Sequence, residues 1–163
     1  ISYIPQNPSL FLGSVRDNVL MGNPHLSDEE FEELLLDTNL DVLVKSQEMG
    51  LDLPVGELGC RLSGGQRQMV ALAAGLANNG NLVLMDEPTA ALDKSSEKHF
   101  LRRMKAKLNN KTVIISTHKP HLLQLVDRII IFENGKIVID GPKEEVLGKL
   151  ADNQKIKTVM HHE

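Results

Sequence analysis

The sharpest chemical pattern in the chain is the run Leu62-Ser63-Gly64-Gly65-Gln66, which opens a helical stretch of small and apolar residues. A serine followed by two glycines at a helix start leaves backbone N–H groups uncovered, and the helix dipole adds positive potential there. Ser63 and these amides would suit a phosphate group. A plain glycine turn is the alternative for a bare Ser-Gly-Gly, but the five-residue run is far more specific.

A second pattern places two carboxylates directly after a strand. Residues 82–85 form a continuous apolar run of strand length, and Asp86 and Glu87 follow it. Ligands of open α/β sheets bind at the carboxyl edge of the strands. In a nucleotide hydrolase the aspartate would hold Mg²⁺, directly or through water, and the glutamate would polarise the attacking water. The alternative is that the two carboxylates simply mark a strand end in contact with water. That alternative is weakened because Asp86 lies about twenty residues after the glycine run.

His118 and Gln6 also stand where the chain leaves a predicted strand. The apolar run 113–115 leads to His118, whose ring would hydrogen-bond a terminal phosphate or hold a water molecule. The first strand is predicted at residues 2–4, and the prolines that break it place Gln6 in a loop. A lone histidine or a loop amide is more often structural, so neither residue indicates a site by itself.

These residues need an α/β sheet to position them. The runs 82–85 and 113–115 do not alternate polar and apolar residues, which is typical of strands buried on both faces of a parallel sheet. A helix is predicted between them at 95–108, so that the segment reads as a βαβ unit. Capping and turn signals predict four more elements: a helix opening at 27–30, a helix at 63–77, a hairpin that turns at 133–135 and a short helix from 141–142.

Composition bounds the class of protein. The chain is 41% hydrophobic and 25% charged, as in an average soluble globular protein. It contains neither a secretory signal at its start nor an apolar run of the roughly 18 residues that a membrane helix needs. A net charge of −4 and a 3% aromatic content argue against nucleic acid as a partner. The lone Cys60 fits a reducing compartment.

Taken together, the patterns resemble the nucleotide-binding domain of an ABC transporter over about residues 2–150. The resemblance implies a P-loop NTPase-like α/β fold, a three-layer αβα sheet domain with a helical subdomain. The matching motifs are the Q-loop at 3–6, the signature motif at 62–66, Walker B at 82–87, the D-loop at 91–93 and the switch histidine at His118. We expect three parts. Residues of about 9–80 would form the helical subdomain, and residues of about 81–150 would form the Walker B, D-loop and H-loop strands together with the hairpin. Residues 151–163 would be a polar tail.

The resemblance implies ATP as the substrate and Mg²⁺ as the metal. Glu87 would be the general base and His118 would hold the γ-phosphate, while Asp86 and Gln6 would serve the metal. In the family two such domains pair head to tail and sandwich ATP between them. The residues that would contact the nucleotide of the partner domain are Ser63, Gly64, Gly65 and Gln66, and Asp93 would bridge the two domains.

Finer features resemble exporters. Residues 10–18 are similar to the stretch after the Q-loop in exporters, and residues 55–59 are similar to their X-loop, which touches the coupling helices of the membrane domain. Residues 117–119 and 140–143 look like bacterial type I secretion ATPases, which export large adhesins or toxins. The expectation is an exporter ATPase at the cytoplasmic face of the inner membrane, with a second nucleotide-binding domain and transmembrane domains as partners.

One family motif does not occur in the sequence. A P-loop requires Gly-x-x-x-x-Gly-Lys-Ser/Thr, whereas the Gly-Lys pairs at 135–136 and 148–149 are each followed by an apolar residue. We therefore predict that the chain is a C-terminal fragment and that it is inactive as an ATPase by itself. Two alternatives remain: a catalytically inactive interaction module, and a soluble ABC ATPase of translation or DNA repair, against which the exporter-like stretches speak.

Overall fold

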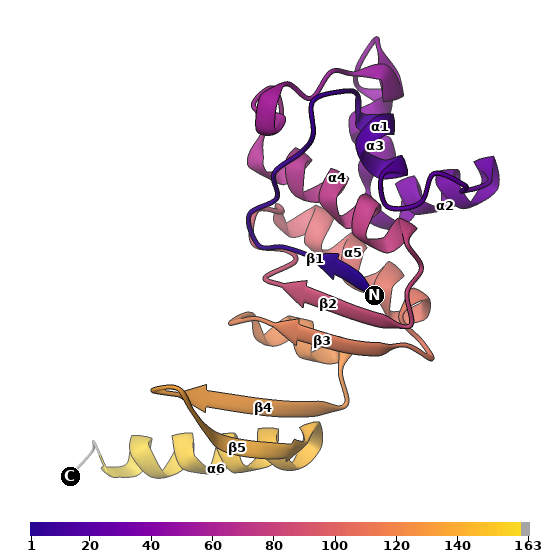
Figure 1. Cartoon of the computed structure of the whole chain (residues 1–163). Coiled ribbons are helices and arrows are strands. Elements are labelled where there is room, and N and C mark those ends of the chain that lie inside the picture. The colour runs from indigo at the N-terminus through magenta and orange to yellow at the C-terminus, as the bar shows by residue number, and fades with distance from the viewer. Residues whose placement is uncertain (161–163) are drawn as a thin grey trace. The chain divides into compact units, whose positions relative to one another are not determined.

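The computed structural model describes residues 1–160, and it describes side chains up to residue 151. The chain forms two compact units, which we call unit 1, Ile1–His118, and unit 2, Lys119–Glu163. Figure 1 labels their helices and strands. Within the described residues, every helix is too short or too polar to span a bilayer.

Unit 1 contains a parallel sheet of three strands in the order β1-β2-β3. The strands are β1 Ser2–Ile4, β2 Leu82–Asp86 and β3 Thr112–Ser116. Ile4 is paired with Met85, and Asp86 with Ser116, so the carboxyl ends of all three strands reach the same edge. The predicted α/β class and the strand at each motif are therefore confirmed.

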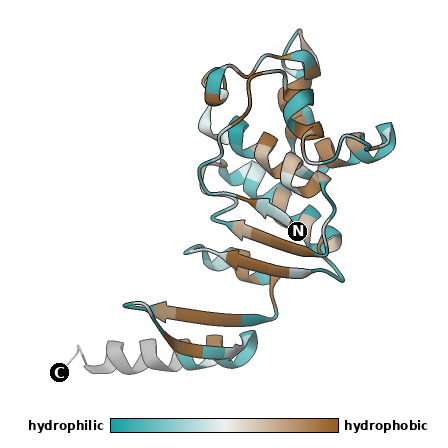
Figure 2. Ribbon diagram, viewed as in Figure 1, coloured by the Kyte–Doolittle hydropathy of each residue, from teal (hydrophilic) through white to brown (hydrophobic). Residues whose placement is uncertain are grey.

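Burial differs between the two apolar strands. In β2, Val83 and Met85 are buried, and the residues between them are half-buried. In β3 every residue is half-buried or exposed, and Ile114 is 58% exposed. The expectation of burial on both faces is therefore wrong for β3. The physical reason is packing: β1, the other outer strand, lies against α4, whereas the main packing partner of β3 is β2. Figure 2 shows that both strands are nevertheless largely hydrophobic.

The helices of unit 1 begin where the sequence supplies caps. They are α1 Val15–Leu20, α2 Asp28–Thr38, α3 Leu40–Lys45, α4 Gly64–Ala77 and α5 Lys94–Lys107. Short 3₁₀ turns lie at Gly50–Asp52 and Glu57–Gly59. Ser14, Ser27 and Ser63 each form a capping box with the residue three positions later, which satisfies backbone N–H groups that have no partner within the helix.

Helix α4 is the centre of packing in unit 1. It contacts α1, α2, α3 and β1, and Figure 1 shows these elements gathered around it. Small residues allow the close approach. A Cβ atom on Gly75 would lie 2.6 Å from Ile4 Cγ1 and 2.9 Å from the carbonyl oxygen of Tyr3, so β1 lies directly against this glycine. The packing holds β1, and the loop that follows it, against the helix that carries the glycine run.

Unit 2 is an antiparallel hairpin followed by a helix. A 3₁₀ segment, Pro120–Leu125, precedes β4 Arg128–Glu133 and β5 Lys136–Pro142. Asn134 and Gly135 both have positive φ, 48° and 75°, as a two-residue type I′ turn requires. The predicted hairpin is confirmed. The final helix is longer than predicted, because α6 runs over Lys143–Met160 and includes residues 151–160 of the expected tail. Residues 161–163 lie outside the described part.

Candidate functional site

Three predicted site residues lie at the carboxyl edge of the sheet. Asp86 ends β2, Gln6 follows β1 by two residues, and His118 follows β3 by two residues. Because the strands are parallel and neighbours in the order β1-β2-β3, their ends are adjacent. The sheet topology thus brings together residues that are more than 100 positions apart in the sequence.

Glu87 is the most highly connected residue at this edge. Its backbone N–H donates to the carbonyl oxygen of Ser116 at 2.9 Å and so joins the ends of β2 and β3. The backbone N–H of His118 donates to Glu87 Oε1 at 2.8 Å, and His118 Nδ1 lies 2.6 Å from the same oxygen. Thr117 Oγ1 donates to Glu87 Oε2 at 3.0 Å. The carboxylate is therefore held on both oxygens by the segment that follows β3.

The backbone of Glu87 is strained. Its φ is +43°, in the left-handed region that non-glycine residues rarely adopt. Glu87 is 8% exposed, whereas the side chain of His118 is 77% exposed. Such strain is found mainly at functional sites, where surrounding contacts enforce it. Here those contacts turn the Glu87 carboxylate away from the strand direction and towards the residues after β3.

Burial raises the pKa of Glu87, but the hydrogen bonds from the side chain and backbone of His118 and from Thr117 together outweigh it and hold the pKa below its usual value. The carboxylate is therefore ionised at neutral pH, as a general base must be. A carboxylate stabilised by these bonds is also a weaker base than a free one. Loss of the bond from the His118 ring would make the Glu87 carboxylate more basic.

From the same hydrogen bonds we can predict how removing the charge of Glu87 changes the free energy of unfolding at different pH values. Because the folded pKa is lowered, the bonds stabilise the fold above the ordinary glutamate pKa of about 4.3, and this stabilisation is lost as pH falls through the folded value. We expect Glu87→Gln to lower the free energy of unfolding at neutral pH, and the difference from the unsubstituted chain to shrink in acid. Denaturant titrations at several pH values measure this. A difference that is the same at every pH would contradict it.

The glycine run forms the start of α4. Ser63 Oγ accepts from the backbone N–H of Gln66 at 3.2 Å, and Gln66 Oε1 accepts from the backbone N–H of Ser63 at 2.8 Å. Gly64 is exposed. A Cβ atom on Gly65 would lie 2.9 Å from the carbonyl oxygen of Ala91, so only glycine allows this close contact with the D-loop segment. In this conformation the two polar side chains of the run cap the helix.

A hollow of about 580 Å³ connects the separate motifs. Its lining includes Gln6 after β1, Glu57 from the 3₁₀ turn, Gly64 and Arg67 from α4, and Ala91. Arg67 Nη1 donates to the carbonyl oxygen of Leu62 at 2.7 Å, which fixes the approach to the helix. The residues matched to the Q-loop, the signature motif and the D-loop therefore share one hollow.

Asp93 is engaged within the chain. Its Oδ1 accepts from the backbone N–H groups of Ser95 at 2.8 Å and Ser96 at 3.0 Å, and its Oδ2 accepts from Ser96 Oγ at 2.8 Å. These bonds, first among them the backbone bond from Ser96, hold the pKa of Asp93 below its usual value. Asp93 is thus the N-cap of α5, and it remains exposed to solvent.

A magnesium site at the sheet edge would be an open one. Among the described residues, no group of three or more His, Cys, Asp and Glu side chains could enclose a metal ion. Mg²⁺ at nucleotide sites is typically held by one or two carboxylates, several waters and the phosphates themselves. Asp86 and the amide oxygen of Gln6, at neighbouring strand ends, are oxygen ligands of the kind that such an ion needs. The residues present fit Mg²⁺ that arrives with a nucleotide.

Thr117 is a residue that the sequence analysis missed as part of the site. Its hydroxyl donates to Glu87, but a threonine at a strand end is too common to indicate a function. The contact depends on the left-handed backbone of Glu87, which turns the carboxylate towards Thr117. Nothing about a glutamate at this position predicts that its backbone is left-handed.

A parallel α/β sheet with these polar groups at its carboxyl edge, beside a glycine-rich helix start, defines a nucleotide-binding domain of the P-loop NTPase type. The sequence model of the ABC transporter family matches residues 1–90, which is more than half of the chain. The chain belongs to the ABC transporter family.

Relatives and a solved structure agree with this assignment. The chain is 37% identical over 149 residues to the glutathione/L-cysteine transport system ATP-binding/permease protein CydC of Escherichia coli, covering 91% of the chain and 26% of that protein. It is 34% identical over 148 residues to the ATP-dependent lipid A-core flippase 1 of Colwellia psychrerythraea, covering 91% and 25%. The structure of a bacterial Atm1-family ABC exporter with ATP bound matches with a TM-score of 0.83 and 29% identity, covering 91% and 26%. The chain spans about a quarter of the length of these proteins.

Proposed function

We propose that the chain is part of the ATP-binding and ATP-hydrolysing subunit of an ABC exporter, in which ATP hydrolysis drives transport out of the cell. Residues 1–150 would belong to its ATPase domain. The single observation that carries the proposal is the contact of the strained Glu87 carboxylate with His118 at the edge where Asp86 and Gln6 also lie. An ionised carboxylate held by an exposed histidine is suited to activating water beside a terminal phosphate.

Each residue at the edge would have one role in hydrolysis. Glu87 would take a proton from the attacking water, and its lowered pKa keeps it ionised for that task. His118 would turn from Glu87 towards the γ-phosphate, which both positions the phosphate and releases the base. Mg²⁺, held by Asp86 and Gln6, would neutralise charge on the phosphates. The reaction is dominated by positioning and charge, for which a preformed edge of this kind is suited.

A second nucleotide-binding domain would complete the site. The residues that we propose to contact ATP on the partner domain are Ser63, Gly64, Gly65 and Gln66, at the start of the fourteen-residue helix α4. Exposed amides at a helix start favour binding of phosphate oxygens. Asp93, exposed at the start of α5, would bridge the two domains. This arrangement is supported by the exposure of Gly64 and of Asp93 to solvent.

A transmembrane domain is the second partner that we propose. Three large apolar side chains after the Q-loop are exposed: Phe11 at 62%, Leu12 at 82% and Met21 at 57%. Phe11 and Met21 also line a hollow of about 420 Å³ on the same part of unit 1. A contiguous exposed apolar surface typically marks an interaction site. Docking of a membrane-domain helix there would place the chain at the cytoplasmic face of the inner membrane.

The narrower proposal for the cargo is a protein that leaves the cell by type I secretion. It rests on the likeness of residues 117–119 and 140–143 to secretion ATPases. Deleting the gene and comparing the proteins in the culture medium tests it. Loss of one large extracellular protein is the expected result, and an unchanged set of secreted proteins would overturn it.

Cell fractionation separates the exporter from the soluble alternative. We expect the polypeptide that carries this chain to remain with the membrane after a high-salt wash and to dissolve only in detergent. Recovery in the soluble fraction would favour an ABC ATPase of translation or DNA repair instead.

The isolated chain of 163 residues is expected to hydrolyse no ATP and to bind ATP weakly. The reason is that no P-loop sequence is present to surround the phosphates with backbone N–H groups and a lysine. Phosphate release and calorimetric titration with MgATP measure both properties. Turnover by the purified chain that disappears in Glu87→Gln would contradict the prediction. Adding the chain to a complete nucleotide-binding domain and measuring its ATPase rate tests the interaction-module alternative.

A further inference from the structure

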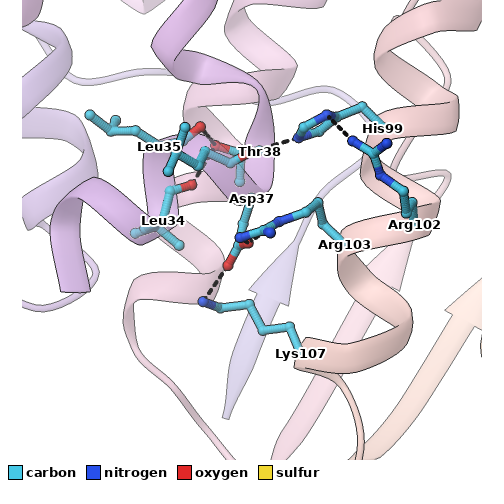
Figure 3. A network of polar contacts seen from close by, with 9 residues as sticks. Leu34, Leu35, Asp37, Thr38, His99, Arg102, Arg103 and Lys107 are labelled. Atoms are coloured by element: carbon cyan, nitrogen blue, oxygen red, sulfur yellow. Dashed lines mark hydrogen bonds and ion pairs between the residues drawn. The ribbon is translucent and has the colours of Figure 1, made fainter. Parts of the chain in front are cut away.

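The last turn of α2 is attached to one face of α5 by a row of polar contacts. Residues 36–39 provide the α2 side. Figure 3 shows the centre of this row, where Arg103 and Lys107 contact Asp37 and His99 reaches α2 separately. The partners on α5 recur at a helical spacing of three and four residues and therefore lie on one face of that helix: Ser96, His99, Arg103 and Lys107.

Asp37 anchors this contact. It is 2% exposed, and it stands at the carboxyl end of α2, where the helix dipole disfavours a negative charge. Arg103 Nη2 lies 2.6 Å and Lys107 Nζ 2.5 Å from its carboxylate oxygens. His99 Nε2 lies 2.6 Å from the carbonyl oxygen of Leu36, which also accepts from the backbone N–H of Asn39 at 3.4 Å. The end of α2 is therefore held at a defined place along α5.

Asn39 extends the contact to the start of α5. It ends α2 in the left-handed conformation, with φ 61°, and its Nδ2 donates to Ser96 Oγ at 3.2 Å. Glycine is the residue most often found in this backbone conformation, with asparagine the less common choice. The amide side chain of Asn39 adds what glycine would lack, which is a hydrogen-bond donor directed at Ser96.

The Asn39 bond fixes the direction of the Ser96 hydroxyl. A serine hydroxyl has one hydrogen to donate and two lone pairs that accept. Because a lone pair of Ser96 Oγ accepts from Asn39, its hydrogen is directed to Asp93 Oδ2, 2.8 Å away. Ser96 is 4% exposed, so little water competes for the hydroxyl. The three residues form a chain of hydrogen bonds from the end of α2 to the D-loop carboxylate.

We propose that Asn39 is a positioning residue for Asp93, acting through Ser96. The consequence is that the helical segment between the Q-loop and the signature motif determines how the D-loop carboxylate is presented. Its importance for hydrolysis rests on the proposed function, in which Asp93 bridges two domains. Ala91, two residues before Asp93, lies against Gly65, so the D-loop is held between the signature helix and this relay.

The test is a carboxyl-carbon NMR titration of Asp93 in the 163-residue chain. Asn39→Gly keeps a residue that accepts the left-handed backbone but removes the donor. We expect the pKa of Asp93 to rise towards the ordinary aspartate value in Asn39→Gly, although residue 39 does not touch Asp93, and to rise further in Ser96→Ala. Asn110→Gly is the matched control, because Asn110 also has a left-handed backbone, with φ 64°, but lies beyond the other end of α5. Its replacement should leave the pKa of Asp93 unchanged.

A double-mutant cycle separates the relay from general loosening of the helices. In the Ser96→Ala background, Asn39→Gly should have no further effect on the pKa of Asp93. An unchanged pKa of Asp93 in a folded Asn39→Gly chain would overturn the proposal. So would an Asn39→Gly substitution that shifts this pKa equally in the presence and in the absence of Ser96. If Asn39→Gly does not fold, Asn39→Asp, which tolerates the left-handed backbone and also removes the donor, is compared with the unsubstituted chain by hydrogen exchange of the Ser95 amide: faster exchange supports the relay and unchanged exchange overturns it. The measurement involves no ATP, so its failure is distinct from failure of the proposed hydrolysis.

Discussion

Replacing Glu87 with glutamine is expected to lower the rate of ATP hydrolysis by about 10²–10⁴-fold, the range that general-base catalysis contributes. The assay requires a polypeptide that joins this chain to a P-loop. Glutamine has the size of glutamate and retains one oxygen that can accept from His118, whereas its NH₂ group takes the place of the oxygen that accepts from Thr117. It cannot take a proton from water. ATP binding should therefore persist while turnover is lost. This is the signature of a group that acts in the transition state rather than in binding.

Steady-state phosphate release and nucleotide binding, measured on the same preparation, check this result. Glu133→Gln is a matched control, because Glu133 is an exposed glutamate at the hairpin of unit 2 and should leave both quantities unchanged. His118→Ala is expected to reduce turnover as well. A Glu87→Gln protein that keeps at least half of the original turnover would remove Glu87 from the role of base.

The largest expected effect on stability concerns the buried Asp37. Replacing both of its partners, Arg103→Met with Lys107→Met, should lower the free energy of unfolding of unit 1 by about 3–5 kcal/mol, the cost of a buried charge left without compensation. Asp37 is 2% exposed, so water cannot replace the lost cations. Each single substitution should cost less, because one cation still faces the carboxylate at 2.5 or 2.6 Å.

Denaturant unfolding of the single, double and triple variants measures this effect. The triple variant adds Asp37→Leu and should recover most of the loss, since replacing a whole buried ionic cluster by apolar side chains is often neutral. Recovery in the triple variant distinguishes the unpaired charge from a general loss of packing. A double variant within about 1 kcal/mol of the unsubstituted chain, the value of an exposed ion pair, would show that water reaches Asp37.

Local patterns predicted several elements of the fold, among them the strand that ends at the site. The capping box at Ser27, the turn at Asn134-Gly135 and the apolar run that ends at Asp86 each depend on residues within a few positions of one another. For such patterns the cause of the structure lies in the neighbouring residue types, so the sequence is sufficient. Parallel pairing also followed, because a helix between two apolar strands favours a right-handed crossover.

The contacts that give the site its chemistry were not predictable in this way. The left-handed backbone of Glu87 occurs at a residue type that rarely adopts it, and it exists because the carboxylate gains three hydrogen bonds from residues 117 and 118. The exposure of Ile114 likewise depends on which elements pack against its strand, not on its own apolar run. In both cases a tertiary contact overrides the local preference.

By itself, the sequence determined the fold class and the order of the family motifs, and it predicted which residues would bind nucleotide and metal. The tertiary structure alone decided that Glu87 is paired with His118, that Asp37 is neutralised by two cations, and that Asn39 reaches Ser96. These last two contacts join residues 66 and 57 positions apart. A hydrogen bond or ion pair across such a separation depends on the packing of whole helices. That packing results from many weak contacts between side chains all over the helices, so no short pattern of residues can predict it.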